Sequence, residues 1–332
     1  MKPAARILFA VLRTGIGFGL LIYLGISGAI NWSALFGMAA AWPVTVAAFL
    51  ILLVDVWVTS LRLCVLFAPR GLHLSTFASV RLMLIGVFFN ACLPGSTGGD
   101  LVKIYYATEG NRGRRTEVAT IILLDRATGM FALMIWPLLA ALFFPRLVAS
   151  LPVLRALLLG AGAIAAAMLV GWSVATSPRV RENALLARAL QRLPLGSYVQ
   201  RVFDTVYAFR DNGASVLAAV GLSLLAHTLS VGVTLLAARA TNPGGVAWEM
   251  ALLIPLGHLA NTLPLTPGGL GVGEAAFNSL FAMAGLTGGA EALLGWRILT
   301  ILIGLIGLGY YLQGRKKFIH SAGGAALPES QA

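Results

Sequence analysis

Long apolar runs, separated by short polar loops, extend along most of the chain. Six of them reach the roughly 20 residues that a helix needs to cross a hydrocarbon core about 30 Å thick. This pattern predicts an all-α polytopic membrane protein with about six full transmembrane helices. The six predicted spans cover residues 6–29, 43–67, 118–144, 153–176, 214–238 and 292–313.

Two further apolar regions, residues 77–101 and 248–286, are each interrupted at the centre by proline and glycine. The first break reads Leu-Pro-Gly-Ser-Thr-Gly-Gly-Asp from Leu93, and the second reads Leu-Pro-Leu-Thr-Pro-Gly-Gly-Leu-Gly-Val-Gly-Glu from Leu263. The apolar arms beside each break are too short to span comfortably. Both regions are therefore predicted to be re-entrant hairpins, with opposite orientations.

The two breaks share a spacing, since Pro94 and Pro264 each stand four residues before a Gly-Gly pair. Ser96 and Thr266 occupy the same offset after these prolines. Paired discontinuous segments in inverted halves point to the binding site of a transporter. We therefore predict an inverted repeat, with the alternative that the breaks are two unrelated helix-breaking loops.

The predicted architecture is one transmembrane domain over residues 1–319, with half one at about 6–144 and half two at about 153–313. Each half is helix, helix, re-entrant hairpin, helix. The basic stretch between the halves, about residues 179–212, carries leucine and alanine at helical spacing and is predicted to include an interfacial amphipathic helix. Residues 320–332 are predicted to be a disordered cytoplasmic tail.

The distribution of basic residues predicts the orientation. With the N-terminus in the cytoplasm, most of the 24 lysines and arginines fall on the cytoplasmic side, and only Arg146, Arg155 and Arg239 fall on the other. Such a bias is the positive-inside pattern. It predicts a multi-pass protein of the cell inner membrane with both termini in the cytoplasm.

Composition excludes a soluble protein. Hydrophobic residues make up 58% of the sequence and charged residues 11%, and the mean hydropathy is +0.87, so a bilayer must act as the solvent. The net charge of +12 is spread over short loops, which predicts contact with anionic lipid head groups and not with nucleic acid. Walker A, zinc-protease, serine-hydrolase and EF-hand motifs are absent, so no cofactor, metal or catalytic residue is predicted.

Charged residues inside the predicted membrane segments are the first candidates for a site, because each costs roughly 2.5 to 3.5 kcal/mol on insertion scales. Asp100 closes the first break, and Lys103 follows it on the same helical face. Gly98 and Gly99 leave backbone N–H groups near a helix start, which suits an anionic group such as phosphate. The alternative is that Asp100 only caps the helix that follows.

The second break offers the same choice. Glu274 opens the helix after Gly268 and Gly269 and is interpreted either as a substrate ligand or as a cap. Asp125 and Arg126 lie inside the third predicted span, where neighbours point about 100° apart, so at least one is expected to meet a group on another helix. Arg126 suits bidentate binding of phosphate. The alternative is an ion pair that fixes helix packing.

Weaker polar candidates accompany these charges. Asn90 and Asn261 precede the two breaks, and Ser96 and Thr266 lie inside them. All four are included as substrate-binding candidates. For the asparagines, the alternative is a role in ending a helix or packing a hairpin.

Three more ionisable residues are left open by the sequence. Asp55 lies within the second predicted span, two turns before Arg62 on the same side, and either couples an ion or pairs with an arginine. His227 and His258 stand alone on apolar helices, where packing is the commoner role and proton transfer or ligand binding is the alternative.

These residues carry a resemblance to a known family. The marks are residues 90–106 with Gly99-Asp100 and Lys103-Ile-Tyr-Tyr, the Asp125-Arg126 pair followed by Gly129, and Thr266-Pro-Gly-Gly-Leu-Gly-Val-Gly-Glu. Over about residues 6–313 the chain resembles the transmembrane, flippase-like domain of the lysylphosphatidylglycerol synthase family. The third mark is the most specific. The sequence departs from many relatives in carrying Asp100 where glutamate is expected, which bears on the substrate.

The resemblance implies movement of a polar lipid or lipid-linked substrate between leaflets, by a transporter and not an enzyme. Full-length relatives add a soluble aminoacyl-transferase domain, which is not expected here because the sequence stops soon after its last predicted span. The expected partners are membrane lipids with a polar or anionic head group, and a second copy of the chain or a separate lipid-synthesis enzyme. The alternatives are an intramembrane lipid-modifying transferase and a non-transporting accessory subunit of lipid or envelope biosynthesis.

Overall fold

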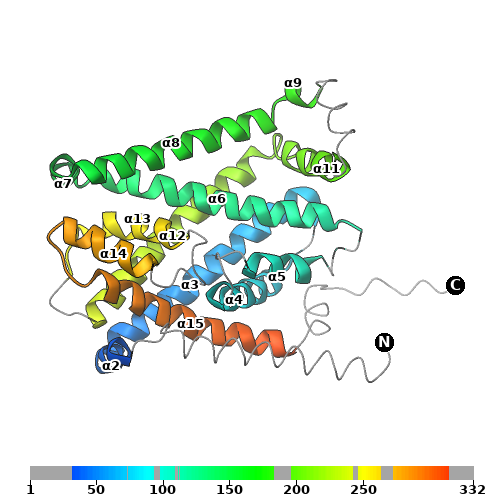
Figure 1. The fold of residues 1–332 in the computed structure, drawn as a ribbon. Coiled ribbons are helices and arrows are strands. Elements are labelled where there is room, and N and C mark those ends of the chain that lie inside the picture. The colour runs from blue at the N-terminus through cyan, green and yellow to red at the C-terminus, as the bar shows by residue number, and fades with distance from the viewer. Residues whose placement is uncertain are drawn as a thin grey trace.

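The computed structural model describes residues 32–72, 74–92, 98–108, 111, 113–182, 196–241, 246–262 and 272–313. Every regular element within these ranges is a helix (Figure 1). The fold is that of an all-α polytopic membrane protein. Five of the six predicted spans are found, and the first, at residues 6–29, lies outside the described part. The helices long and apolar enough to cross a membrane are α3 (Trp42–Phe67), α6 (Arg115–Ala141), α8 (Pro152–Ala175), α12 (Gly213–Thr241) and α15 (Gly289–Gln313).

Each interrupted region forms a hairpin of two short helices. The first pairs α4 (Thr76–Cys92) with α5 (Gly98–Ala107), and the second pairs α13 (Met250–Asn261) with α14 (Val272–Met283). At 1.5 Å per residue, α5, α13 and α14 are only about 15 to 18 Å long, well short of a hydrocarbon core. The described helices end and begin on either side of each predicted break, while re-entry into the membrane stays a prediction.

The remaining helices are short. Two of them, α9 and α11, fall in the stretch predicted to be an amphipathic helix, and residues 183–195 of that stretch lie outside the described part. Packing of α11 against α6 and α8 fixes its place, while its position at a membrane surface stays a prediction. These short elements are α2 (Trp32–Ala40), the 3-10 turn η1 (Ala68–Arg70), α7 (Pro145–Ser150), α9 (Pro178–Arg181) and α11 (Gly196–Tyr207).

The helices α3 and α12 pack against each other and contact α6 and α15, while α8 packs on the outside of α6 (Figure 1). Each hairpin packs against the last helix of the other half, because α4 contacts α15 and α13 contacts α6. Small residues permit the closest of these contacts. A Cβ at Gly307 on α15 would clash with the carbonyl oxygen of Leu84 on α4, and a Cβ at Gly304 would lie 3.2 Å from Phe88 Cα.

The first hairpin closes through two glycines. The backbone N–H of Gly99 on α5 donates to Asn90 Oδ1 at 2.8 Å, and a Cβ at Gly99 would clash with the carbonyl oxygen of Gly86. A Cβ at Gly86 would in turn lie 3.2 Å from Lys103 Cδ. Since the neighbours of Gly99 include backbone, only glycine fits at the start of α5.

The second hairpin repeats these contacts. A Cβ at Gly273 would clash with Asn261 Oδ1, and a Cβ at Gly257 would clash with the ring of Phe277. The second break is therefore three residues longer than the first. The matched residues are Gly86 and Gly257, Asn90 and Asn261, and Arg126 and Arg297, each 171 positions apart, and Gly99 and Gly273, Asp100 and Glu274, and Lys103 and Phe277, each 174 positions apart.

This register differs from the one that the break sequences indicate. Matching Pro94 with Pro264 implies a shift of 170 positions and equates Gly99 with Gly269. The contacts instead equate Gly99 with Gly273. The physical reason is that the equivalent glycine is the one that lies against the asparagine of the preceding helix. The second break has four glycines from which to choose. Residues 93–97 and 263–271 lie outside the described part.

Candidate functional site

Asp100 is the centre of a buried charge cluster at the start of α5. Its Oδ1 lies 2.6 Å from Lys103 Nζ, and its Oδ2 accepts a hydrogen bond from Arg126 Nη1 at 2.7 Å. Asp100 lies in the first turn of α5, where the helix dipole favours an acidic side chain. The structure thus brings together three predicted site residues, and the carboxylate binds two cations and does not serve as a simple cap.

Asp125 faces away from Arg126, as the helical geometry of neighbouring residues predicts. Its carboxylate receives two hydrogen bonds from Arg62, from Nε at 2.6 Å and from Nη2 at 3.0 Å. Arg62 Nη1 donates to Ser223 Oγ on α12 at 3.0 Å. A Cβ at Gly129 would lie 2.9 Å from Arg62 Nη1, so the glycine leaves room for the guanidinium. This forked ion pair joins α3, α6 and α12 in the core.

One alternative from the sequence pairs Asp55 with an arginine such as Arg62. In the structure Arg62 pairs with Asp125 instead. Asp55 Oδ1 is buried and has no hydrogen-bond partner among the described residues. The sequence could not select between the two carboxylates. Asp55 shares α3 with Arg62, whereas the approach of Asp125 on α6 depends on how the two helices pack.

Glu274 forms the matching acidic site in the second half. Its Oε1 lies 2.8 Å from Arg297 Nη2, and the same nitrogen donates to Asn261 Oδ1 at 3.3 Å. Arg297 is 7% exposed. It did not belong to the predicted site, although its position as a lone cation in an apolar run was the available signal.

The two halves therefore share an acid, an arginine and an asparagine, but differ at one position. Lys103 adds a second cation to the first cluster, whereas Phe277 takes the matching place in the second. Counting formal charges on the named groups, the cluster of Asp100, Lys103 and Arg126 carries one excess positive charge, and the pair of Glu274 and Arg297 carries none.

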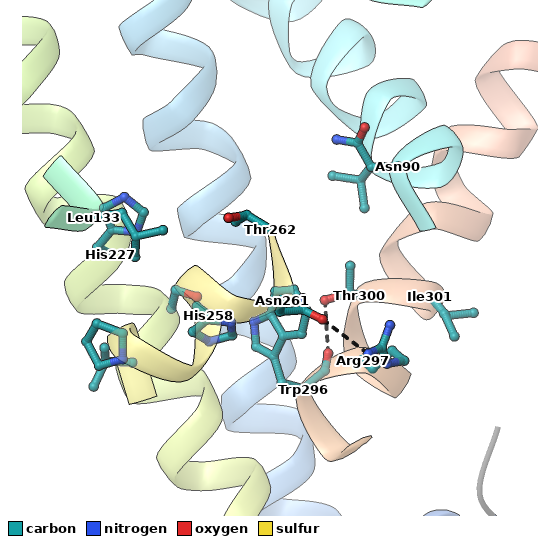
Figure 2. A pocket seen from close by; sticks show the side chains of 14 residues that line it. Asn90, Leu133, His227, His258, Asn261, Thr262, Trp296, Arg297, Thr300 and Ile301 are labelled. Carbon is teal, nitrogen blue, oxygen red and sulfur yellow. Dashed lines mark hydrogen bonds between the residues drawn. The ribbon is translucent and has the colours of Figure 1, made fainter. Parts of the chain in front are cut away.

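A cavity of about 300 Å³ lies beside the second cluster (Figure 2). Asn90 reaches it from α4, Asn261 and His258 from α13, His227 from α12, and Arg297 from α15. It therefore lies between the halves and receives one asparagine from each hairpin. The other lining residues are Val87, Leu133, Ser230, Val231, Pro255, Thr262, Trp296, Thr300 and Ile301.

The two histidines of the cavity also have partners in the protein. His227 Nε2 lies 2.9 Å from the carbonyl oxygen of Gly129, and His258 Nε2 lies 3.3 Å from Thr234 Oγ1. The ring of His258 packs edge to face against Phe277 and Trp296. Packing thus accounts for much of their environment, while their position on the cavity wall leaves both able to face a ligand.

The structure does not bring all predicted site residues to one place. Asn90 and Asn261 line the cavity, whereas Asp100, Lys103, Arg126 and Asp125 are not among its lining residues. Gly98 and Gly99 are buried at the start of α5. Ser96, Thr266, Gly268 and Gly269 lie outside the described residues. Within the part of the chain that is described, no group of three or more histidine, cysteine or acidic side chains could hold a metal ion.

The fold and these clusters define a polytopic membrane protein that holds several ion pairs within its helical core, around broken hairpins. The chain belongs to the family of the lysylphosphatidylglycerol synthase transmembrane region, whose sequence profile matches residues 7–307. Membership supports a role connected with membrane lipids. No curated protein and no solved structure matches the chain.

Proposed function

We propose that the protein moves a polar lipid, or a lipid-linked substrate, between the leaflets of the cell membrane. The observation that supports this most directly is the cavity between the halves, into which both broken hairpins place an asparagine. Discontinuous helices from two related halves form the substrate sites of many transporters. Neither catalytic chemistry nor a cofactor is required by this function.

The size of the cavity fits a head group and not a whole lipid. At about 300 Å³ it stands at the lower end of the range for small-molecule pockets. A polar head group would enter it while the acyl chains stay in the bilayer. Arg297 would then exchange part of its contact with Glu274 for the head group, because phosphate and carboxylate oxygens suit the same guanidinium donors.

In this proposal the cluster of Asp100, Lys103 and Arg126 is a second place at which the substrate binds. Its excess positive charge, from Lys103 and Arg126 against Asp100, favours an anionic head group. In the present arrangement the three side chains bind one another and the cavity lies at the second cluster. Rocking of one half against the other would open the first cluster and close the second. The proposed orientation places both termini in the cytoplasm.

The test uses purified protein in vesicles that contain a phosphatidylglycerol labelled on a short acyl chain, so that the head group stays free to enter the cavity. Extraction of the label by external albumin measures how fast lipid reaches the outer leaflet. We expect the protein to accelerate this step and Arg297→Gln to reduce the acceleration at least tenfold, the effect of losing about 1.4 kcal/mol of a charge-assisted contact. Arg239→Gln, an exposed arginine at the end of α12, is the matched control.

Three outcomes would contradict the proposal. Equal rates with and without folded protein favour the accessory subunit. A new lipid species, found by mass spectrometry after incubation, favours the intramembrane transferase. Transport that Arg297→Gln leaves unchanged would remove the second cluster from the substrate path. Elution as a single species on size exclusion shows that each variant is folded.

A further inference from the structure

A second hollow lies on the other side of α6, away from the polar cavity. It has a volume of about 390 Å³ and lies between α6, α8 and α12. It shares no described lining residue with the central cavity. The residues that line this groove are Leu124, Ala127, Thr128, Phe131, Met168, Leu169, Trp172, Thr176, Phe209, Arg210, Gly213, Val216, Leu217 and Val220.

The walls of the groove are mainly apolar. Most lining side chains are apolar, and the two threonines use their hydroxyls within their own helices. Thr128 Oγ1 donates to the carbonyl oxygen of Asp125 at 2.8 Å, and Thr176 Oγ1 donates to that of Trp172 at 2.8 Å. Because both hydroxyls already have hydrogen-bond partners, the described long walls of the groove favour an apolar ligand.

One end of the groove is charged. Arg210 is the one ionisable side chain among the described lining residues, and it is exposed. Its Nη1 donates to Tyr207 Oη at 3.0 Å, and its guanidinium lies 5.9 Å from the centre of the Tyr207 ring. These contacts hold the cation at the mouth. Asp204 and Asp211, on the same stretch of chain, do not line the groove.

The groove extends inward from that charged end. Along α8 the lining runs from Thr176 to Met168, and along α12 from Gly213 to Val220, each about 10 to 12 Å at 1.5 Å per residue. Trp172 lines the groove midway along this stretch of α8. The outer face of α8 exposes Leu169 and Val170, which places the groove beside lipid.

We propose that this groove binds an anionic phospholipid, with one acyl chain between α6, α8 and α12 and the phosphate at Arg210. A single cation at the mouth of a carbon-lined channel complements a molecule with one negative head and an apolar chain. The site is separate from the substrate cavity and does not depend on transport.

The test measures contact between the lipid chain and Trp172. In a variant that keeps Trp172 and carries phenylalanine at the other six tryptophans, fluorescence is quenched by phospholipids with brominated acyl chains. Vesicles of phosphatidylcholine hold a small fraction of brominated phosphatidylglycerol or of brominated phosphatidylcholine. We expect about a fivefold preference for the anionic lipid, the effect of one basic residue near a head group. Arg210→Gln removes that preference, and Arg179→Gln, an exposed arginine on α9, retains it.

Equal quenching by the two lipids, or a preference that survives Arg210→Gln, would overturn the proposal. No quenching by either lipid in a protein that migrates as a dimer would assign the groove to a second copy instead. Native mass spectrometry of the unmodified chain, compared with Arg210→Gln, gives the same answer without the tryptophan replacements: the anionic lipid must be retained by the first and lost by the second. Arg297→Gln leaves both readouts unchanged, so failure of this site is distinguishable from failure of transport.

Discussion

At the scale of single residues, three arginines of the helical core each lie against an acidic side chain. Arg62 lies against Asp125, Arg126 against Asp100, and Arg297 against Glu274. A charge left alone in such surroundings is costly, whereas replacement of a whole pair by apolar groups is often neutral. Loss of one partner is therefore expected to lower the stability of the fold, whereas replacement of both partners can leave it unchanged.

Asp125→Asn tests this at the most buried pair. Asp125 is 1% exposed, so the substitution leaves the Arg62 cation without its counter-charge. We expect unfolding in detergent to become easier by about 3 kcal/mol, measured by thermal or denaturant titration. The double variant Arg62→Met/Asp125→Leu should recover most of that loss.

The control for this prediction is the pair of Arg114 and Glu117, which lies 2.6 Å apart at the rim of the fold with Arg114 half exposed. Arg114→Gln should cost less than about 1 kcal/mol. Equal losses at the buried and the exposed pair would show that burial does not determine the contribution of either.

At the scale of elements, the hairpins depend on positions where backbones touch. A Cβ at Gly99 would meet the carbonyl oxygen of Gly86, which cannot move without bending α4. We expect Gly99→Ala to displace α5 and to lower both the yield of folded protein and its melting temperature. Gly160 on α8 has open space around it, so Gly160→Ala should be neutral or stabilising by up to about 1 kcal/mol. If both substitutions were equally tolerated, the tight contact between α4 and α5 would be wrong.

The sequence predicts these elements well because run length is a local property. Five spans and both breaks follow from counting apolar residues against the thickness of a bilayer. The partners of the charges do not follow, because they depend on how each helix rotates about its axis. Arg62 is seven residues from Asp55 and 63 residues from Asp125 along the chain. Packing of α3 against α6 and α12 nevertheless pairs it with Asp125. The pairing of Asp100 with Lys103 was accessible, since three residues along a helix bring side chains together.

The equivalence of the two halves was only partly visible in the sequence. The shared proline and Gly-Gly spacing predicted that the breaks correspond. The glycine contacts align Gly99 with Gly273 and not with Gly269, because the second break has three more residues between the matched contacts. The match of Pro94 with Pro264 lies outside the described residues and stays a prediction. Arg126 and Arg297 are equivalent across 171 positions, and neither break sequence contains that information.

The whole molecule is predicted to place its two hairpins at opposite faces of the membrane. In Figure 1 the hairpin of α13 and α14 lies toward one end of the long helices and that of α4 and α5 toward the other. In a chain whose own cysteines are replaced, single cysteines at Thr76 and Thr108 should react with a membrane-impermeant maleimide from the cytoplasmic side. Cysteines at Val246 and Thr287 should react from the opposite side.

Labelling of Thr76 and Thr108 from different sides would mean that the first segment spans the membrane instead of re-entering, and the same holds for Val246 and Thr287. A cysteine at Arg239, an exposed position at the end of α12, calibrates the second face. The result decides the orientation of both halves without reference to transport.

The glycine contact between α15 and α4 has a mechanical consequence. Where Gly307 meets the carbonyl oxygen of Leu84, and Gly304 the backbone of Phe88, two helices touch without intervening side chains. Sliding one helix along the other would drive the larger neighbours of these glycines into the opposing backbone, whereas turning about the point of contact would not. This contact is therefore expected to resist sliding of α15 along α4 and to permit rotation of one helix about the other. In the proposed transport cycle, this contact would be the point about which one half rocks against the other.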